Sequence, residues 1–289
     1  MIKKGILLAG GKGTRLSPLT KSVNKQLLPI YDKPLIFYPL SVLMLAGIKD
    51  ILIIVNKGEL SQFKKILPNG KNLGIKITYA EQKSPRGIPE AFVIGEKFIK
   101  KDKVALILGD NFFYGQNFTE NLRKCTRITS GAKVFLHPVN NPSLYGVAKI
   151  NSANKIVKII EKPKKYISNF AVTGLYFFDN NVVKYCKNLK LSMRNETEII
   201  DLLQKYKSKN KLSTEFIGRG GAWFDTGTIK DFYDASSFVS TLENRQGLKI
   251  ACLEEIALSN KWISKNEIMI AIKFYGKCNY SNYLLKLIS

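Results

Sequence analysis

The stretch from Gly5 to Leu16 reads GILLAGGKGTRL and joins a short apolar run to a glycine-rich loop. The apolar run at positions 6–8 predicts a buried strand. Gly10, Gly11 and Gly13 follow it directly. Glycine has no Cβ, so such a loop can adopt positive φ and turn successive backbone N–H groups toward one anion. The pattern therefore predicts an anion-binding loop at the end of a strand.

Two basic residues, Lys12 and Arg15, lie in the same loop. An arginine guanidinium can hold two phosphate oxygens at once. A strand, a glycine loop and a fixed cation together predict a triphosphate site. A tight turn at the strand end is the alternative for the loop alone. The spacing fits neither the dinucleotide-binding G-x-G-x-x-G pattern nor the G-x-x-x-x-G-K-[ST] loop.

Strands and helices alternate along the first part of the chain. Apolar runs predict strands at 6–8, 51–55, 75–79 and 104–108, with helices at 38–46, 60–67 and 89–98 between them. This alternation predicts an α/β fold with a Rossmann-like, mostly parallel sheet and helices on both faces. From about residue 132 the runs become short, at 134–137, 145–150, 156–160 and 172–178. Those runs predict antiparallel additions to the sheet.

The composition of the 289-residue chain, 45% hydrophobic and 24% charged, is that of an ordinary globular protein. No apolar run approaches the roughly 18 residues that a membrane span needs. The four cysteines form no C-x-x-C pair, which argues against a zinc site or a disulfide framework and predicts a cytoplasmic protein. The formal charge is +24, but the lysines are spread along the chain. We therefore expect no nucleic-acid partner, although a positive field can steer nucleotides.

Three further segments carry a resemblance to a known family. KQLLP at 25–29 and IYDKPLIFYP at 30–39 follow the glycine loop, and GRGGAWFDTGT stands at 218–228. In this order the segments resemble the sugar-1-phosphate nucleotidylyltransferases, and the WxDTGT element is specific to that family. The resemblance implies an enzyme in which a sugar phosphate attacks the α-phosphorus of a nucleoside triphosphate and pyrophosphate leaves. Gln26 is typical of the branch that uses dTTP and glucose 1-phosphate; UTP or another sugar phosphate is the alternative.

A metal site is expected at two aspartates. Asp110 directly follows the apolar run at 104–108. An acidic residue at a strand end can hold Mg²⁺ against substrate phosphates, and a self-satisfied Asp-Asn turn is the other interpretation. The resemblance implies that Asp110 and Asp225 are the Mg²⁺ ligands.

The remaining roles are implied by the resemblance. The catalytic residues are Arg15, Lys25 and Lys162. The nucleotide-binding residues are Leu8, Gly10, Gly11, Gly13, Thr14, Gln26, Gln82, Gly87 and Asp110. The sugar-binding residues are Gly146, Glu161, Lys162, Thr173 and Trp223. A glutamine amide offers a donor and an acceptor side by side, which suits the edge of thymine at Gln82.

The resemblance also implies a helical C-terminal region, residues 241–289, packed on a core of residues 1–240 that carries the sugar-binding strands. It implies a homotetramer and a site for an inhibitory dTDP-sugar end product at Tyr114, Gly115, Arg219, Ala251, Cys252 and Glu255. Thr119 replaces a histidine found in some members. A non-catalytic homologue that only binds nucleotide sugar is the alternative, but it should have lost a metal ligand or Lys162. The segment RNETEIID at 194–201 predicts the start of a helix that supports the site.

Overall fold

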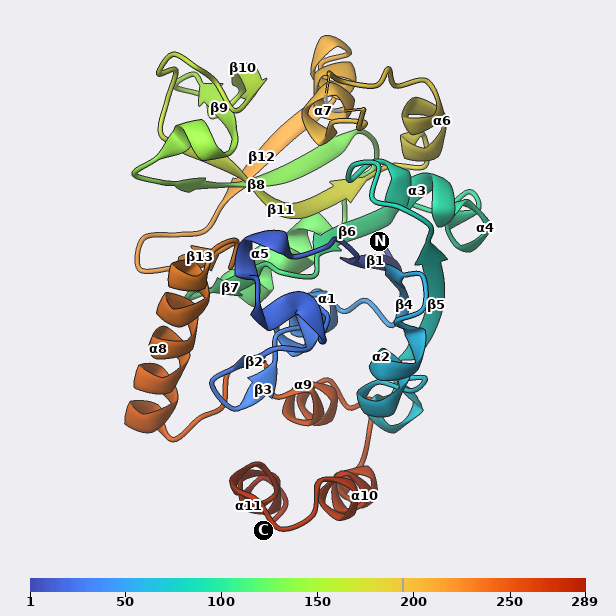
Figure 1. The fold of residues 1–289 in the computed structure, drawn as a ribbon, viewed down its shortest axis with the longest axis vertical. Helices are drawn as coiled ribbons and strands as arrows, with labels where there is room; N and C mark the ends of the chain where they lie inside the picture. The colour runs from blue at the N-terminus through green and yellow to red at the C-terminus, as the bar shows by residue number, and fades with distance from the viewer. Residues whose placement is uncertain (194) are drawn as a thin grey trace.

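A nine-stranded sheet forms the centre of the computed structural model, which describes residues 1–193 and 195–289 (Figure 1). Its parallel part runs in the order β6, β1, β4, β5. These strands are β6 (Val104–Leu108), β1 (Lys4–Ala9), β4 (Asp50–Asn56) and β5 (Lys76–Gln82). All four expected strands are confirmed, so their carboxyl ends meet at one edge of the sheet.

The other part of the sheet is mostly antiparallel, as expected. Strand β11 (Phe170–Phe178) pairs antiparallel with β6 and with β8 (Ala132–Pro138). Strands β9 (Gly146–Ile150) and β10 (Ile156–Glu161) form a hairpin beyond β11. One strand of this large sheet was not anticipated: β12 (Leu212–Phe216) pairs parallel with β8 at an outer edge.

Helices cover both faces of the sheet and enclose two hydrophobic cores. Leu7 of β1 belongs to one core and its neighbour Ile6 to the other, because successive strand residues point to opposite faces. The first core packs against α1 (Phe37–Leu45), α2 (Leu60–Ile66) and α5 (Phe118–Cys125). The second packs against α3 (Glu90–Ile94), α4 (Glu96–Ile99), α6 (Val182–Lys187) and α7 (Ile199–Ser208).

One helix prediction needs correction, and another is confirmed. The expected helix at 89–98 is two short helices, because the backbone leaves helical geometry at Gly95. A Cβ at Gly95 would lie 3.0 Å from Ile6 Cδ1, so the chain passes close to the sheet at this point. The helix start expected within 194–201 is confirmed, because α7 begins at Ile199 with Glu198 as its N-cap. Arg194 of that segment lies outside the described residues.

The C-terminal region is helical. It consists of α8 (Ile229–Gln246), α9 (Leu253–Ser259), α10 (Lys265–Tyr275) and α11 (Asn279–Lys286). The expected division at residue 240 falls within α8. Figure 1 places α10 and α11 at the end of the molecule opposite to β9 and β10. Of the helices that the structure describes, none is both long and apolar enough to cross a bilayer.

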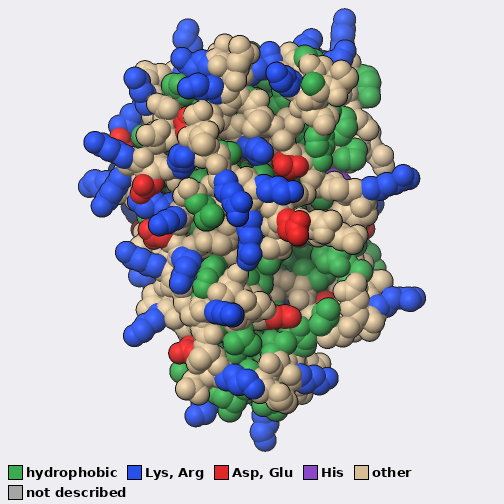
Figure 2. Space-filling model, turned by 180° about the vertical axis from the view of Figure 1, so that it is seen from behind, with side chains coloured by type: hydrophobic (Ala, Val, Ile, Leu, Met, Phe, Trp, Pro, Cys, Tyr) green, Lys and Arg blue, Asp and Glu red, His purple; other side chains and the backbone are tan. Residues whose placement is uncertain are grey.

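Two small strand pairs shape the edge where the parallel strands end. Strands β7 (Phe112–Tyr114) and β13 (Ala222–Phe224) pair antiparallel, with Phe112 opposite Phe224. This pairing brings the turn after β6 next to Asp225. A hairpin of β2 (Pro29–Ile30) and β3 (Lys33–Pro34) follows the KQLLP segment. Figure 2 shows Lys and Arg side chains spread over the whole visible face, which also has a hollow lined by apolar side chains.

Candidate active site

The glycine loop lies at the carboxyl end of β1, and its glycines are required by geometry. Gly11 has φ +107 and Gly13 has φ +58, a region that L side chains rarely adopt. A Cβ at Gly10 would lie 1.7 Å from Gln82 Nε2. Gly10 therefore lies directly against the Gln82 side chain at the end of β5, and Gly11 and Gly13 have backbone conformations that favour glycine.

This loop forms one wall of a cavity of about 240 Å³. Six of the nine expected nucleotide-binding residues line it, namely Gly10, Gly11, Gly13, Thr14, Gln26 and Asp110. The lining also includes two expected catalytic residues, Arg15 and Lys25, together with Leu16 and Gly227. Gln26 is only 3% exposed, and within the described chain its buried Oε1 has no hydrogen-bond partner. Buried carbonyl groups are rarely left unpaired, so this oxygen is available to a ligand donor.

Lys25 and Asp110 form an ion pair in the lining of this cavity. Lys25 Nζ lies 2.8 Å from Asp110 Oδ2, and the Lys25 side chain is 7% exposed. The other carboxylate oxygen of Asp110 accepts a hydrogen bond from Asn111 Nδ2 at 2.9 Å. Thr226 Oγ1 donates to the Asp110 carbonyl at 2.7 Å, which ties the turn after β6 to the WFDTGT segment. Asp110 is therefore held in one orientation by groups from three segments.

Asp225 faces the same space. Burial first, then the neighbouring carboxylates of Asp110 and Asp231, raise the pKa of Asp225 above its ordinary value. The side chains of Arg15 and Asp225 both lie close to Gly227. A Cβ at Gly227 would lie 3.2 Å from Arg15 Nη2 and 3.2 Å from Asp225 Oδ2. A cation between the two carboxylates would remove the repulsion that disfavours their joint ionisation.

The pair Asp110 and Asp225 fits Mg²⁺ better than a metal that needs a complete protein cage. The described residues contain no cluster of three or more His, Cys, Asp or Glu placed to hold a metal. Magnesium is usually held by one or two carboxylates and completes its shell with waters and substrate phosphates. Two carboxylates beside a phosphate-binding loop match that chemistry.

A second cavity, of about 290 Å³, adjoins the first and shares Arg15 and Asp110 with it. It contains four of the expected sugar-binding residues, Gly146, Glu161, Lys162 and Trp223, and also Gly87 and Asp225. Trp223 Nε1 donates to Asn111 Oδ1 at 2.6 Å, so the indole is fixed to the turn that carries Asp110. The Lys162 backbone has φ +41, and its N–H donates to Tyr145 O at 2.9 Å. The two cavities thus form one continuous site with Arg15 and Asp110 at the junction.

The segment before α7 also contributes to the second cavity, through Glu196, Thr197 and Glu198. Gly87 has φ +96, and a Cβ there would lie 1.9 Å from Thr197 O. The loop after β5 and this segment are therefore in backbone contact. The segment was expected only to support the site, because its place in the cavity depends on packing between distant parts of the chain.

Three expected residues do not line either cavity. Thr173 is fully buried and donates from Oγ1 to Phe135 O at 3.1 Å, because along β11 its neighbours Val172 and Gly174 face the cavity instead. Its side chain is therefore not placed to touch a sugar. Leu8 also lies outside both cavities, and its backbone carbonyl accepts a hydrogen bond from Gly109 N–H at 2.8 Å. Gln82 is 5% exposed and donates from Nε2 to Asn56 Oδ1 at 3.1 Å.

A third cavity, of about 480 Å³, lies between α5 and the segment that joins α8 to α9. Five of the six residues expected for inhibitor binding line it: Tyr114, Gly115, Ala251, Cys252 and Glu255. Thr119 and Arg123 line it as well, and Arg219 does not. Arg123 reaches across to α9, where its Nη2 donates to Asn260 Oδ1 at 2.8 Å.

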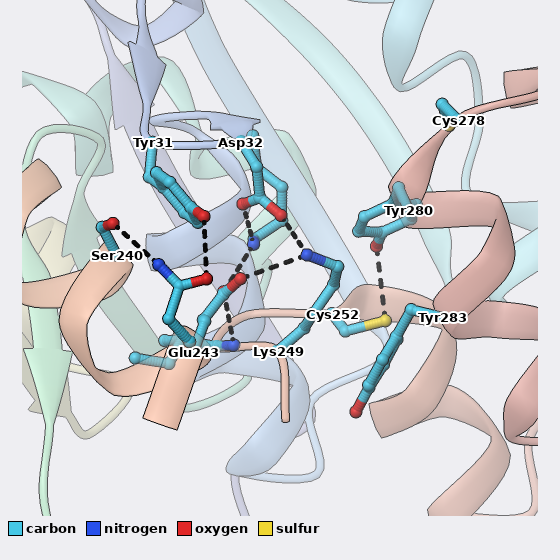
Figure 3. A network of polar contacts seen from close by, with 12 residues as sticks. Tyr31, Asp32, Ser240, Glu243, Lys249, Cys252, Cys278, Tyr280 and Tyr283 are labelled. Atoms are coloured by element: carbon cyan, nitrogen blue, oxygen red, sulfur yellow. Dashed lines mark hydrogen bonds and ion pairs between the residues drawn. The ribbon is translucent and has the colours of Figure 1, made fainter. Parts of the chain in front are cut away.

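An ion network beside this cavity joins the β2–β3 hairpin to the end of α8 (Figure 3). Lys33, 2% exposed, lies 2.9 Å from Glu243 Oε1 and also pairs with Asp32. Lys249 pairs with Asp32 and lies 3.1 Å from Glu243 Oε2. Burial would raise the pKa of Asp32, but the charges of Lys33 and Lys249 outweigh burial and hold it below its ordinary value.

Comparisons with known proteins agree with this geometry. The chain matches the family described as Nucleotidyl transferase over residues 4–241. It is 52% identical to the glucose-1-phosphate thymidylyltransferase of Neisseria meningitidis serogroup A, with 99% of each chain covered. The enzyme of that name from Mycobacterium tuberculosis H37Rv is 46% identical, again over 99% of each chain.

Solved structures share the fold. A crystal structure of a Bacillus anthracis protein in complex with sucrose superposes with a TM-score of 0.76 at 38% identity, covering 81% of this chain and 94% of that one. A UDP-glucose pyrophosphorylase complexed with UDP-glucose gives 0.74 at 26% identity, covering 84% of this chain and all of the other.

Proposed function

Because this chain belongs to the nucleotidyl transferase family, we propose that it transfers a thymidylyl group from dTTP to glucose 1-phosphate, giving dTDP-glucose and pyrophosphate. The observation that carries the proposal is the junction of the two cavities at Arg15 and Asp110. One cavity has a glycine loop suited to a triphosphate, and the other has Lys162 and Glu161, suited to a sugar phosphate. The substrates would therefore meet phosphate to phosphate at this junction.

The reaction is an in-line displacement at the α-phosphorus. A phosphate oxygen of glucose 1-phosphate forms the new P–O bond, and the bond to the β-phosphate oxygen breaks and releases pyrophosphate. The protein has little covalent chemistry to perform, so positioning and charge stabilisation dominate. The backbone of Gly10, Gly11 and Gly13 would cradle the triphosphate. Arg15 and Lys25 would stabilise the negative charge that develops on the departing pyrophosphate.

Lys162 would orient the attacking phosphate, and Glu161 would accept hydrogen bonds from sugar hydroxyls. At Gly146 a Cβ would lie 2.6 Å from Ile200 Cδ1, so β9 packs closely against α7 where it lines the cavity. For the base, Gly87 lines the second cavity and Gln82 lies behind the glycine loop. One of the two N–H groups of the Gln82 amide donates to Asn56, so the base would be read by the rest of the amide.

Asp110 and Asp225 would hold Mg²⁺, which when bound supplies positive charge to the phosphates. Burial first, and then the charge of Asp110, raise the pKa of Asp225, and a bound cation would offset both effects. Residues of this chain thus supply both the metal ligands and the cations that bind the phosphates.

Regulation and assembly are further parts of the proposal. The third cavity would bind a dTDP-sugar end product as an inhibitor, supported by its size and by the five expected residues that line it.

A homotetramer is supported by large apolar side chains exposed on α10, where Ile270 is 57% and Phe274 59% exposed. Sedimentation velocity measures that state directly. A cytoplasmic location is supported by the four free cysteines.

The reaction itself is tested by identifying its products. Purified protein with dTTP, glucose 1-phosphate and Mg²⁺ should yield equimolar dTDP-glucose and pyrophosphate, both visible by ³¹P NMR. Release of pyrophosphate without a nucleotide sugar, or a nucleotide sugar without pyrophosphate, would contradict the proposed displacement.

A further inference from the structure

The side chain of Asn56 holds the peptide groups of Gly11 on both sides. Asn56 is the last residue of β4, next to the glycine loop. Its Oδ1 accepts from Gly11 N–H at 3.0 Å, and its Nδ2 donates to Gly11 O at 3.0 Å. Gly11 has φ +107, and a glycine chain is free to leave such a conformation. The amide of Asn56 therefore supplies the restraint that the glycine loop lacks on its own.

Glu59 extends this contact to the second phosphate-binding segment. Its Oε2 accepts from Asn56 Nδ2 at 3.0 Å and from Asn24 Nδ2 at 2.5 Å. Asn24, 6% exposed, accepts from Gln26 N–H at 2.8 Å and caps the short helix of Lys25, Gln26 and Leu27. A single carboxylate thus connects the glycine loop to the segment that carries Lys25.

Gln82 belongs to the same hydrogen-bonded cluster, because its Nε2 donates to Asn56 Oδ1 at 3.1 Å. Gln82 also packs against Gly10. Neither Asn56 nor Glu59 is among the residues that line the two cavities of the active site. Their hydrogen bonds nevertheless reach the glycine loop and the segment after Asn24.

We propose that Asn56 and Glu59 are positioning residues, which fix the glycine loop and Lys25 relative to each other so that both meet the same triphosphate. The inference rests on the proposed function. Donors that are already aimed at the phosphates need no rearrangement as charge develops, and small misplacements of such groups cost up to about 100-fold in rate. The hydrogen bonds of this cluster reach the glycine loop and the segment after Asn24, so we place its effect on the nucleotide side of the site.

The test compares Asn56→Ala, Glu59→Ala and Glu59→Gln with a matched control, Glu81→Ala. Glu81 Oε1 accepts from Gly58 N–H at 2.8 Å, in the turn between Asn56 and Glu59, and does not contact the glycine loop. Asn56→Ala and Glu59→Ala should lower kcat/KM for dTTP about 10- to 100-fold and leave KM for glucose 1-phosphate nearly unchanged. Glu59→Gln retains an acceptor oxygen and should recover most of the activity. Glu81→Ala should behave as wild type.

Calorimetric titration of dTTP and Mg²⁺ into each variant, without sugar phosphate, separates this inference from the proposed function. If the wild type does not bind dTTP, the proposed function itself fails. If the wild type binds dTTP and the folded Asn56→Ala variant binds equally well with unchanged kcat/KM, the positioning role is wrong. Equal weakening of both substrates would also overturn it. If an alanine variant does not fold, Glu59→Gln serves as the test, because it keeps the size and shape of the side chain. Loss of dTTP binding by Glu59→Gln, despite a native melting curve, would contradict a hydrogen-bonding role for Glu59.

Discussion

Lys25 Nζ and Asp110 Oδ2 lie 2.8 Å apart at the centre of the proposed active site. The cation assigned to the pyrophosphate is therefore paired, before substrates arrive, with a carboxylate assigned to the metal. Binding of a magnesium triphosphate would replace this pair by two others, Asp110 with the metal and Lys25 with phosphate. The pair keeps a 7% exposed lysine compensated until then.

Replacing Lys25 should separate the proposed role of Lys25 at the phosphates from that of Asp110 at the metal. Lys25→Met keeps the length of the side chain and removes its charge, so kcat should fall about 100- to 1000-fold, as for loss of one preorganised electrostatic group. Binding of Mn²⁺ as a probe for Mg²⁺ should not weaken, because Nζ no longer competes for Asp110. Lys21→Met, at an exposed lysine that does not line the cavity, is the control. Unchanged kcat in Lys25→Met would contradict the assignment.

Lys162 should act on the sugar phosphate alone. Lys162→Ala should raise KM for glucose 1-phosphate about tenfold or more, lower kcat, and leave the Kd of dTTP unchanged, because a charged hydrogen bond to one substrate is lost. Lys164→Ala removes an exposed lysine of the same turn that does not line the cavity. Steady-state kinetics with each substrate varied in turn gives the comparison, and equal losses for both substrates would show that the role is wrong.

Arg123 offers a test of the inhibitor site. It lines the third cavity and carries the fixed charge that a pyrophosphate linkage would need. Arg123→Ala should weaken inhibition by dTDP-rhamnose about tenfold or more and leave the uninhibited rate unchanged. Arg127→Ala, an exposed residue just beyond α5 and outside the lining, is the matched control. Identical inhibition curves for wild type and Arg123→Ala would contradict the assignment of the third cavity as the inhibitor site.

The ion network in Figure 3 predicts a pH dependence of stability. The folded pKa of Asp32 is held below its ordinary value by Lys33 and Lys249, against the effect of burial. Asp32 therefore stabilises the fold above about pH 3.9, the ordinary value of an aspartate, and this contribution is lost as pH falls through the folded pKa. Urea unfolding of Asp32→Asn should show a deficit at pH 6 that shrinks in acid. Asp234→Asn, which breaks an exposed pair with Lys230, should show a smaller deficit. A deficit for Asp32→Asn that grows in acid would reverse the sign and contradict the account.

The sequence predicted the parts of the fold that depend on local patterns. Apolar runs located the parallel strands, and Gly10 to Gly13 located the loop at the end of β1. Thr173 shows the limit of a resemblance, because strand alternation turns its side chain away from the cavity that Val172 and Gly174 line.

Contacts between distant segments could not be predicted in this way. The three-residue strands β7 and β13 are too short for a periodic signal, yet their pairing brings Asp225 to Asp110. Asn56 belongs to no recognised sequence motif. Its hydrogen bonds to Gly11 become evident only in the folded chain, where the end of β4 lies beside the glycine loop. Gly95, where the expected helix divides, likewise lies close to Ile6 of β1, a contact between segments distant in the sequence.

The most direct test of the central claim is the rate of pyrophosphate release with glucose 1-phosphate and each of dTTP, UTP, CTP, ATP and GTP. Thymine and uracil present the same N3–H donor and O4 acceptor to Gln82, and the 5-methyl group is worth roughly 1–3 kcal/mol, or about 10- to 200-fold. The account predicts that dTTP is best, UTP a measurable second, and the others poor. A preference for a purine triphosphate would contradict it.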